Sequence, residues 1–186
     1  MSCTENISQL KAADFKKNIG GKETALYILK NSQGCEVAIT NYGGAICSIM
    51  VPDKNGNFAN VIQGHDSIDN LLNSPEPFLS TLVGRYGNRI CKGKFTIDGK
   101  EYNLAINNGP NHLHGGTKGY ANKLWESRVE TNRVVFSLVS EDGDQGYPHE
   151  LTIEAIYDFD DENNLEITYL AKSDGTTPVN LTNHVY

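Results

Sequence analysis

The side chains best suited to proton transfer in this sequence are histidines, and two of them stand out by their neighbours. His184 follows Asn183 near the carboxyl end of the sequence, and His114 precedes two glycines. Imidazole titrates near neutral pH, so it can hold a proton at working pH and release it during a reaction. A lone histidine in a strand is more often structural, but its polar neighbours favour a general-acid role for His184.

Another histidine lies two residues before His114. On an extended segment, His112 and His114 would point to the same face. Three interpretations are open: a hydrogen-bonded structural pair, a metal site, and a contact with a polar organic substrate. Metal binding ranks lowest, because Lys118 and Gly119 occupy the positions where a carboxylate ligand is expected and the next carboxylate is Glu126.

Two arginines, Arg85 and Arg89, lie four residues apart in a glycine-containing segment. A guanidinium presents its donors in a fixed geometry that suits carboxylates, phosphates and sugar hydroxyls. Either arginine could therefore meet a phosphate or a hydroxyl group of a substrate. The competing interpretation is an exposed ion pair, which contributes little to stability.

Composition and charge restrict the partners that the chain can have. Its 186 residues include 16 Lys and Arg against 23 Asp and Glu, for a formal net charge of −7. An acidic chain is poorly suited to nucleic-acid phosphates or anionic membrane surfaces, so we expect neither partner. No apolar run approaches the length of a membrane span, and residues 1–15 lack the apolar core of a secretory signal. These features favour a cytoplasmic location.

The four cysteines show no spacing typical of a zinc or redox site. We expect them to be free thiols, buried as small apolar side chains in a reducing compartment. They are Cys3, Cys35, Cys47 and Cys91.

Alternation of apolar and polar residues with a period of two dominates the chain and predicts β-strands. Turn residues such as Gly34 and Gly99 separate several of these stretches into hairpins. Helical periodicity is confined to residues 8–17 and 67–73. This pattern indicates an all-β chain, folded as an antiparallel β-sandwich or barrel in one domain. The predicted strands are residues 25–30, 35–40, 45–51, 94–97, 101–104, 125–131, 134–140, 151–159, 165–170 and 177–186.

Five short motifs, taken in their order along the chain, resemble the aldose 1-epimerases, also called galactose mutarotases. They are Asn-Tyr-Gly-Gly at 41–44, Val-Gly-Arg-Tyr-Gly-Asn-Arg-Ile at 83–90, Asn-His-Leu-His-Gly-Gly at 111–116, Gly-Tyr-Pro at 146–148, and Pro-Val-Asn-Leu-Thr-Asn-His at 178–184. Each motif alone is weak, but five in this order are specific. The resemblance implies a large antiparallel β-sandwich and an isomerase that interconverts the α and β anomers of hexoses such as galactose and glucose.

The resemblance also assigns roles to particular residues. It implies that Asn88 and Arg89 bind sugar hydroxyls, that His114 forms a hydrogen bond near the ring oxygen, and that His184 is the general acid. Tyr186 would line the pocket beside it. The implied partner is a small hexose, with neither a cofactor nor a metal. His149 departs from the family pattern, because a glycine is more usual there.

Members of this family are considerably longer, and the resemblance implies that their general base, a glutamate, lies in a part of the fold that would follow Tyr186. We therefore expect residues 1–186 to be the N-terminal portion of a single truncated sandwich domain, inactive on its own. The alternative is a non-catalytic carbohydrate-binding or regulatory module on the same fold. A third interpretation is an interaction fragment, because a half-sandwich would expose unpaired strand edges.

Overall fold

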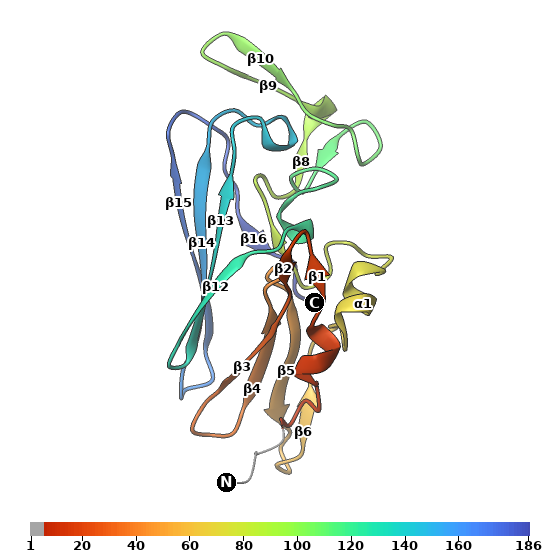
Figure 1. Cartoon of the computed structure of the whole chain (residues 1–186), viewed down its shortest axis with the longest axis vertical. Coiled ribbons are helices and arrows are strands. Elements are labelled where there is room, and N and C mark those ends of the chain that lie inside the picture. The colour runs from red at the N-terminus through yellow and green to blue at the C-terminus, as the bar shows by residue number, and fades with distance from the viewer. Residues whose placement is uncertain (1–5) are drawn as a thin grey trace.

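Two four-stranded antiparallel sheets face each other in the computed structural model, which describes residues 6–186 (Figure 1). In the first sheet the order is β3-β4-β5-β6, and in the second it is β12-β13-β14-β15. The first contains β3 (Leu26–Lys30), β4 (Glu36–Thr40), β5 (Ile46–Pro52) and β6 (Phe58–Asn60). The second contains β12 (Glu126–Glu130), β13 (Arg133–Ser140), β14 (Leu151–Phe159) and β15 (Leu165–Ser173). The predicted all-β sandwich is confirmed.

Side-chain alternation explains why these segments form strands with one buried face. Along β14 every second residue from Leu151 to Phe159 is buried, while the residues between them are more exposed. Successive side chains of a strand point to opposite faces, so this sequence can bury only one of its two rows in the core. The register follows, and Tyr157 lies opposite Val134 on one side and Ile167 on the other.

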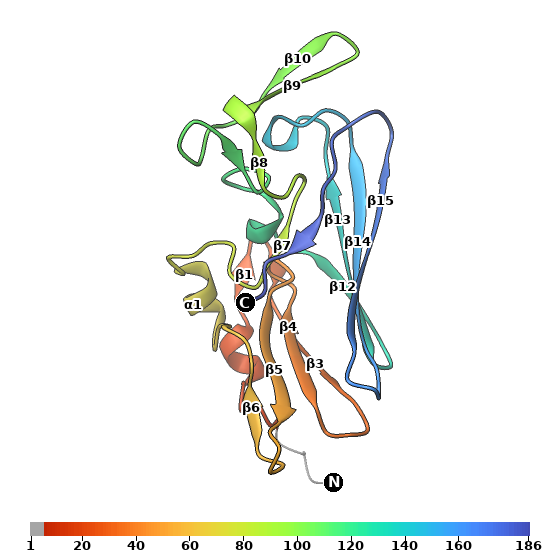
Figure 2. The same cartoon turned by 180° about the vertical axis from the view of Figure 1, so that it is seen from behind.

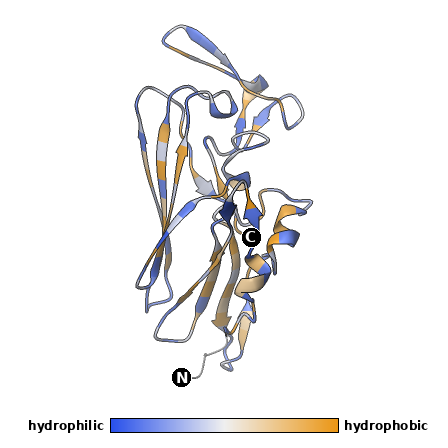
Figure 3. Cartoon of the chain, in the orientation of Figure 1, coloured by the Kyte–Doolittle hydropathy of each residue, from blue (hydrophilic) through white to orange (hydrophobic). Residues whose placement is uncertain are grey.

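The core fills the space between the two sheets. Val37 and Ile39 from the first sheet belong to the same buried cluster as Phe136 and Tyr157 from the second. Tyr27 meets Phe136 edge to face, with 5.7 Å between the ring centroids, which is a favourable aromatic geometry. Hydrophobic residues accordingly gather on the strands of both sheets (Figure 3).

Short ribbons and turns connect the sheets and carry most of the polar motifs. Seen from behind, β16 lies alongside β7 between the two ends of the molecule (Figure 2). The ribbons are β1 (Asn18–Ile19) with β2 (Lys22–Glu23), β7 (Leu82–Val83) with β16 (Thr182–Asn183), β8 (Arg89–Ile90) with β11 (His112–Leu113), and β9 (Lys94–Ile97) with β10 (Lys100–Asn103). The helical segments are α1 (Ile68–Leu72) and four 3₁₀ turns, Ala12–Phe15, Cys91–Gly93, Tyr120–Asn122 and Asp144–Gly146.

Several details depart from the predictions. The final strand is wrong in extent, because only Thr182–Asn183 of residues 177–186 is a strand. Upstream of it, Pro178 has no N–H to donate, and Asn180 pairs with the loop at 84–87 instead of with a sheet. The helix predicted at 67–73 is confirmed as α1, capped by the Ser67 hydroxyl, which accepts a hydrogen bond from the Asn70 N–H. The one or two helical turns predicted within 8–17 are present as the 3₁₀ turn Ala12–Phe15.

The cysteine prediction is confirmed at two positions. Cys35 and Cys47 are buried free thiols, and burial raises the pKa of Cys47. Cys91 is exposed, so the prediction of burial is wrong there, because the residue starts a surface turn after β8. Cys3 lies outside the described residues. Within residues 6–186, no helix combines the length and the apolar character needed to cross a membrane.

The Asn31 side chain links the β3–β4 turn of the first sheet to the β14–β15 turn of the second. Its Nδ2 donates to the Asp160 carbonyl at 3.0 Å and to the Asn163 Oδ1 at 2.6 Å, and both partners lie in the β14–β15 turn. Its Oδ1 accepts from the backbone N–H of Cys35 at 3.0 Å and of Gln33 at 3.2 Å. The Asn31 side chain and the Cys35 N–H are buried, so this N–H depends on Asn31 for its acceptor, whereas Gln33, Asp160 and Asn163 are exposed.

We predict that Asn31→Ala lowers the free energy of unfolding by about 1–3 kcal/mol, because it leaves the buried Cys35 N–H without its acceptor and removes both hydrogen bonds to the β14–β15 turn. Urea denaturation monitored by tryptophan fluorescence measures this loss. Ser32→Ala, at the exposed neighbouring position, is the control and should change stability by less than about 0.5 kcal/mol. Equal effects of the two substitutions would show that Asn31 does not link the sheets energetically.

Candidate active site

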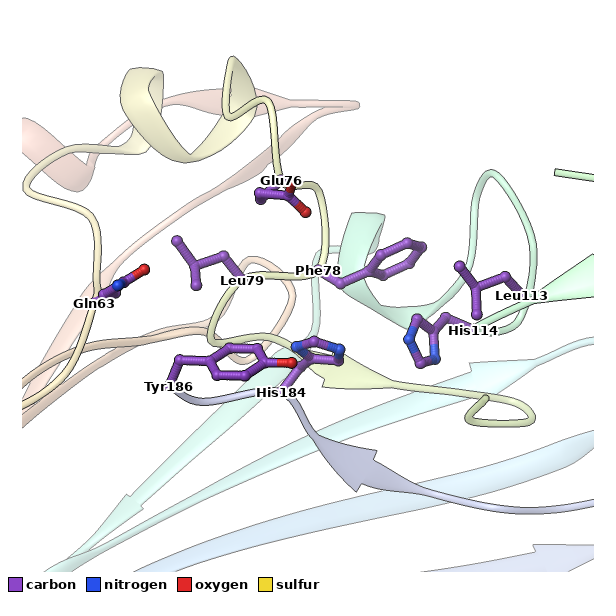
Figure 4. A pocket seen from close by; sticks show the side chains of 8 residues that line it. All are labelled: Gln63, Glu76, Phe78, Leu79, Leu113, His114, His184 and Tyr186. Carbon is purple, nitrogen blue, oxygen red and sulfur yellow. The ribbon is translucent and has the colours of Figure 1, made fainter. Parts of the chain in front are cut away.

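A pocket of about 460 Å³ opens beside the β7–β16 ribbon (Figure 4). It combines two imidazoles, two aromatic rings, aliphatic side chains, an amide and a carboxylate. Pockets of this mixed kind, mostly apolar with a few polar groups, suit a small organic ligand. Its lining residues are Gln63, Glu76, Phe78, Leu79, Leu113, His114, His184 and Tyr186.

The two histidines come from distant parts of the sequence and meet in this pocket. The ring centroids of His114 and His184 lie 5.1 Å apart, with the ring planes at 84°. Phe78 packs on the edge of His114 at 4.8 Å and lies 6.5 Å from His184. On the other side, Tyr186 lies 5.0 Å from His184 (Figure 4). Two proton-carrying side chains therefore face one small volume.

Strand pairing fixes the position of His184. In the β7–β16 ribbon, Asn183 lies opposite Leu82. The backbone of His184 then continues the pairing, since its N–H donates to the Thr81 carbonyl and its carbonyl accepts from the Ser80 N–H, both at 2.9 Å. The imidazole Nδ1 is buried and has no hydrogen-bond partner within residues 6–186. The backbone is thus held by two hydrogen bonds, while one ring nitrogen is enclosed without a partner.

A buried tyrosine supports the same segment from the core. The Tyr157 hydroxyl donates to the Gly44 carbonyl at 2.7 Å and accepts from the Asn183 Nδ2 at 3.3 Å. A Cβ on Gly44 would lie 2.4 Å from the Leu82 side chain, so this turn requires glycine. The first predicted motif, at 41–44, therefore supports the residue that precedes His184.

His114 is held by the segment that contains Asn88. Its backbone N–H donates to the Asn88 carbonyl at 3.0 Å, and its Nδ1 accepts from the Asn88 N–H at 2.9 Å. Because Nδ1 is an acceptor, the neutral ring carries its proton on Nε2. Burial, helped by the nearby charges of His184 and Arg89, lowers the pKa of His114 to about 4. At neutral pH His114 is therefore an uncharged hydrogen-bond donor.

Asn88 and Arg89 lie close to His114 but do not line the pocket. Both side chains are exposed. The Arg89 guanidinium donates to the Asn108 Oδ1 at 3.0 Å and to the Asn88 Oδ1 at 3.2 Å. Since Leu113 pairs with Arg89 in the β8–β11 ribbon, both donors sit at the side of the pocket next to His114. Hydroxyl groups of a bound molecule extending past His114 would meet them there.

His112 is structural, and the prediction that it shares a face with His114 is wrong. Its ring is fully buried, with Nδ1 2.7 Å from the Ala105 carbonyl and Nε2 2.8 Å from the Tyr147 hydroxyl. His114 adopts a positive φ of 52°, so the segment is not extended and the two side chains diverge. Both nitrogens of His112 are already bonded within the protein, so of the three interpretations the structural one holds for His112.

Arg85 cannot meet a phosphate, contrary to the prediction that either arginine could. Its side chain is 1% exposed, and its guanidinium is bonded to carbonyl and hydroxyl groups of the surrounding loops. Phe78, Gln63 and Glu76 are pocket residues that sequence reasoning missed, because they lie in irregular segments with neither a motif nor a period. Their place in the pocket follows only from tertiary structure.

A β-sandwich with two imidazoles facing one pocket defines a class of protein suited to proton transfer on a small polar molecule. A family model described as aldose 1-epimerase matches residues 25–186. Galactose mutarotase from Bos taurus is 48% identical over 180 residues, which cover 97% of this chain and 52% of that protein. Aldose 1-epimerase from Escherichia coli strain K12 is 36% identical over 167 residues, covering 89% of this chain and 48% of that protein. The chain belongs to the aldose 1-epimerase family.

Solved structures agree with this assignment. A GalM/aldose epimerase homologue from C. elegans superposes with a TM-score of 0.84 at 33% identity, covering 88% of this chain and 50% of that one. Galactose 1-epimerase from Lactobacillus acidophilus superposes with a TM-score of 0.81 at 30% identity, covering 91% of this chain and 50% of that one. The chain therefore spans about half the length of the relatives that it matches.

The lowered pKa of His114 predicts a pH dependence of stability. Between its folded pKa of about 4 and its ordinary value of 6.5, the unfolded chain binds a proton that the folded chain does not. The free energy of unfolding therefore falls as pH falls through this window and is fully recovered above it. Burial also lowers the pKa of His65 and of His112, which adds to the effect in the same direction.

Urea denaturation at about pH 5 and about pH 7.5 measures this dependence. His114→Gln should reduce the difference between the two pH values, because one of the three histidines no longer contributes. Comparing two pH values in the same variant cancels any loss of packing that is common to both. An unchanged difference would show that His114 titrates normally in the folded chain.

Proposed function

We propose that this chain is the N-terminal portion of a single aldose 1-epimerase domain, which interconverts the α and β anomers of hexoses such as galactose and glucose. Membership of the family supports the reaction class. The observation that carries the assignment of residues is the 5.1 Å approach of His114 and His184 inside one pocket. Both catalytic residues implied by the sequence resemblance thus lie where one sugar ring could contact both.

The chemistry requires two proton transfers. A base removes the proton of the C1 hydroxyl while an acid protonates the ring oxygen, and the bond between C1 and the ring oxygen breaks to give an aldehyde. Rotation about the C1–C2 bond and closure with the roles reversed yield the other anomer. Each positioned proton transfer contributes ~10²–10⁴-fold to the rate. Neither a cofactor nor a metal is required by these steps.

His184 is the proposed general acid, and His114 the proposed donor beside it. The low pKa of His114 keeps that ring neutral, so its Nε2–H can donate to the ring oxygen without adding a second positive charge. An imidazolium at His184 can then deliver a proton to the same oxygen and be reprotonated on ring closure. This mechanism needs one neutral ring and one protonated ring. Two positive charges this close would repel each other, so protonation of one imidazole disfavours protonation of the other.

The remaining predicted residues bind the substrate in this proposal. Asn88 and Arg89 form hydrogen bonds to sugar hydroxyls on the His114 side, and an arginine does so without changing its protonation state. Tyr186, 69% exposed, contributes its ring to the pocket beside His184. A hexose satisfies all of these contacts, because it has a ring oxygen next to C1 and a hydroxyl group on most carbons.

The general base is proposed to lie outside this chain, in the half of the family fold that the relatives contain beyond the matched region. Among residues 6–186, Glu76 is the only carboxylate that lines the pocket. Its side chain is exposed, and it lies in the irregular segment between α1 and β7. It therefore lacks the fixed geometry expected of a base that removes the C1 proton.

Polarimetry of freshly dissolved α-galactose tests the proposal. We predict that the 186-residue chain alone does not accelerate mutarotation, whereas the chain joined to the second half of the bovine relative does. In that joined protein, His184→Gln should lower the rate ~10²–10⁴-fold, because the ring oxygen loses its proton donor. His149→Gln, outside the pocket, is the matched histidine control and should retain the rate.

Three outcomes would contradict parts of this account. An inactive joined protein that still binds galactose would favour the alternative of a non-catalytic carbohydrate-binding module. A fully active His184→Gln variant would exclude His184 as the acid. Acceleration by the chain alone would place the base within it, and loss of that activity in Glu76→Gln would then identify Glu76.

A further inference from the structure

We propose that Arg85 is a positioning residue for the two-histidine pocket, joining the β13–β14 connection to the loop that holds His114 and to the segment that leads into His184. The inference rests on the proposed function for its catalytic meaning. The position of Arg85 is observed independently of that function. Arg85 touches neither histidine, but it contacts backbone segments that hold each of them.

The guanidinium is enclosed by three segments that are remote in sequence. Its Nη1 donates to the carbonyls of Pro148 and His149, each at 2.8 Å, and to the Thr177 hydroxyl at 3.0 Å. Its Nη2 donates to the Ser140 carbonyl at 3.0 Å and to the Ser140 hydroxyl at 2.8 Å. Nε is the one guanidinium nitrogen without a partner in residues 6–186. A charge with 1% exposure is tolerated because its two terminal nitrogens are satisfied in this way.

Aromatic and acidic groups extend this enclosure. The Arg85 guanidinium carbon lies 5.6 Å from the centre of the Tyr147 ring, within range of a cation–π interaction. The Ser140 hydroxyl donates to the Asp144 carboxylate at 2.7 Å, and this carboxylate forms an ion pair with Lys123. The Gly-Tyr-Pro motif at 146–148 and the loop that contains Asp144 therefore belong to the network around Arg85. Neither lines the pocket.

The backbone of the same residue holds the other side of the network. The Arg85 carbonyl accepts from the Asn180 N–H at 3.0 Å, and the Asn180 carbonyl accepts from the Gly87 N–H at 2.7 Å. The Asn180 Nδ2 also donates to the Gly87 carbonyl at 2.9 Å. Residues 85–87 and residue 180 are thus locked together shortly before the chain reaches His184.

The loop continues directly to His114. Asn88 follows Gly87, and its N–H and carbonyl are the two backbone groups bonded to His114. At the other end of the loop, a Cβ on Gly115 would lie 1.8 Å from the Gly84 carbonyl, so the chain after His114 packs tightly on the residue before Arg85. A displacement of Arg85 would therefore move the supports of both histidines.

Only an arginine can make these contacts together. Its planar fork presents several donors in fixed directions, whereas a lysine ammonium is a single point charge on a flexible stem. Arg85→Lys keeps the charge but cannot bond Ser140 and the carbonyl of Pro148 at once. Thr177→Val has nearly the same shape as threonine and removes one acceptor, so it is a milder variant that perturbs the same network.

Nuclear magnetic resonance of the imidazole groups in the full 186-residue chain tests the proposal. A pH titration gives the pKa of His114, and addition of galactose gives its affinity. In Arg85→Lys we expect the pKa of His114 to rise from about 4 towards 6.5, because the loosened loop admits water to the ring. We expect galactose binding to weaken by about tenfold or more, as for other misplaced binding groups. Thr177→Val should shift both quantities in the same direction by less.

Val37→Ala is the matched control, because it opens a cavity in the first sheet and lowers stability without touching the loops. It should leave the pKa of His114 and the galactose affinity unchanged at a temperature where the protein is folded. If folded Arg85→Lys behaves like Val37→Ala, Arg85 contributes only stability and the proposal is overturned. If Arg85→Lys does not fold, unchanged values in Thr177→Val overturn it.

The role of Arg85 and the proposed function can be separated by the same measurements. If neither the wild-type chain nor the protein joined to the second half of the bovine relative binds galactose, the proposed function loses its support, while the pKa of His114 in the variants still decides the role of Arg85. If the wild type binds galactose and the variants keep its affinity and its pKa, the proposed function stands and the role of Arg85 falls.

Discussion

The antiparallel pairing of β16 with β7 is the contact on which the pocket depends. Two residue pairs, continued by the backbone bonds of His184 to Thr81 and Ser80, place this segment beside the one that contains Phe78. Without that pairing, His184 would lose the two backbone hydrogen bonds that hold it beside the segment containing Phe78. The sandwich beneath contributes Tyr157, which anchors Asn183 from the core. A large, rigid core thus supports a very short ribbon.

The two histidines have different surroundings. His114 is bonded through Nδ1 to the Asn88 N–H and is partly removed from water, and both features favour its neutral form. His184 lies across the pocket, and its Nδ1 has no partner among residues 6–186. In the proposed mechanism, His114 is the neutral donor and His184 is the proton carrier for opening of the hemiacetal ring. The same fold that excludes water from the core also keeps the His114 ring neutral at neutral pH, because burial lowers its pKa.

Much of this arrangement could be predicted from the sequence, and the failures have physical causes. Period-two alternation located the long strands, because half-buried strands must alternate, and ordered motifs located His114 and His184. Arg85 and Arg89 look alike in sequence, but one is enclosed by carbonyl groups and the other is exposed, a difference that arises only in three dimensions. The side chain of His112 diverges from that of His114 because of a single positive φ, which alternation cannot reveal. Phe78 reaches the pocket from a segment without any pattern.

The most direct test of this account is a crystal structure of the chain with galactose bound. The sugar should occupy the pocket beside Phe78, with its ring oxygen within hydrogen-bonding distance of the Nε2 of His114 and of a ring nitrogen of His184. A sugar bound elsewhere, or one whose ring oxygen points away from both imidazoles, would contradict it.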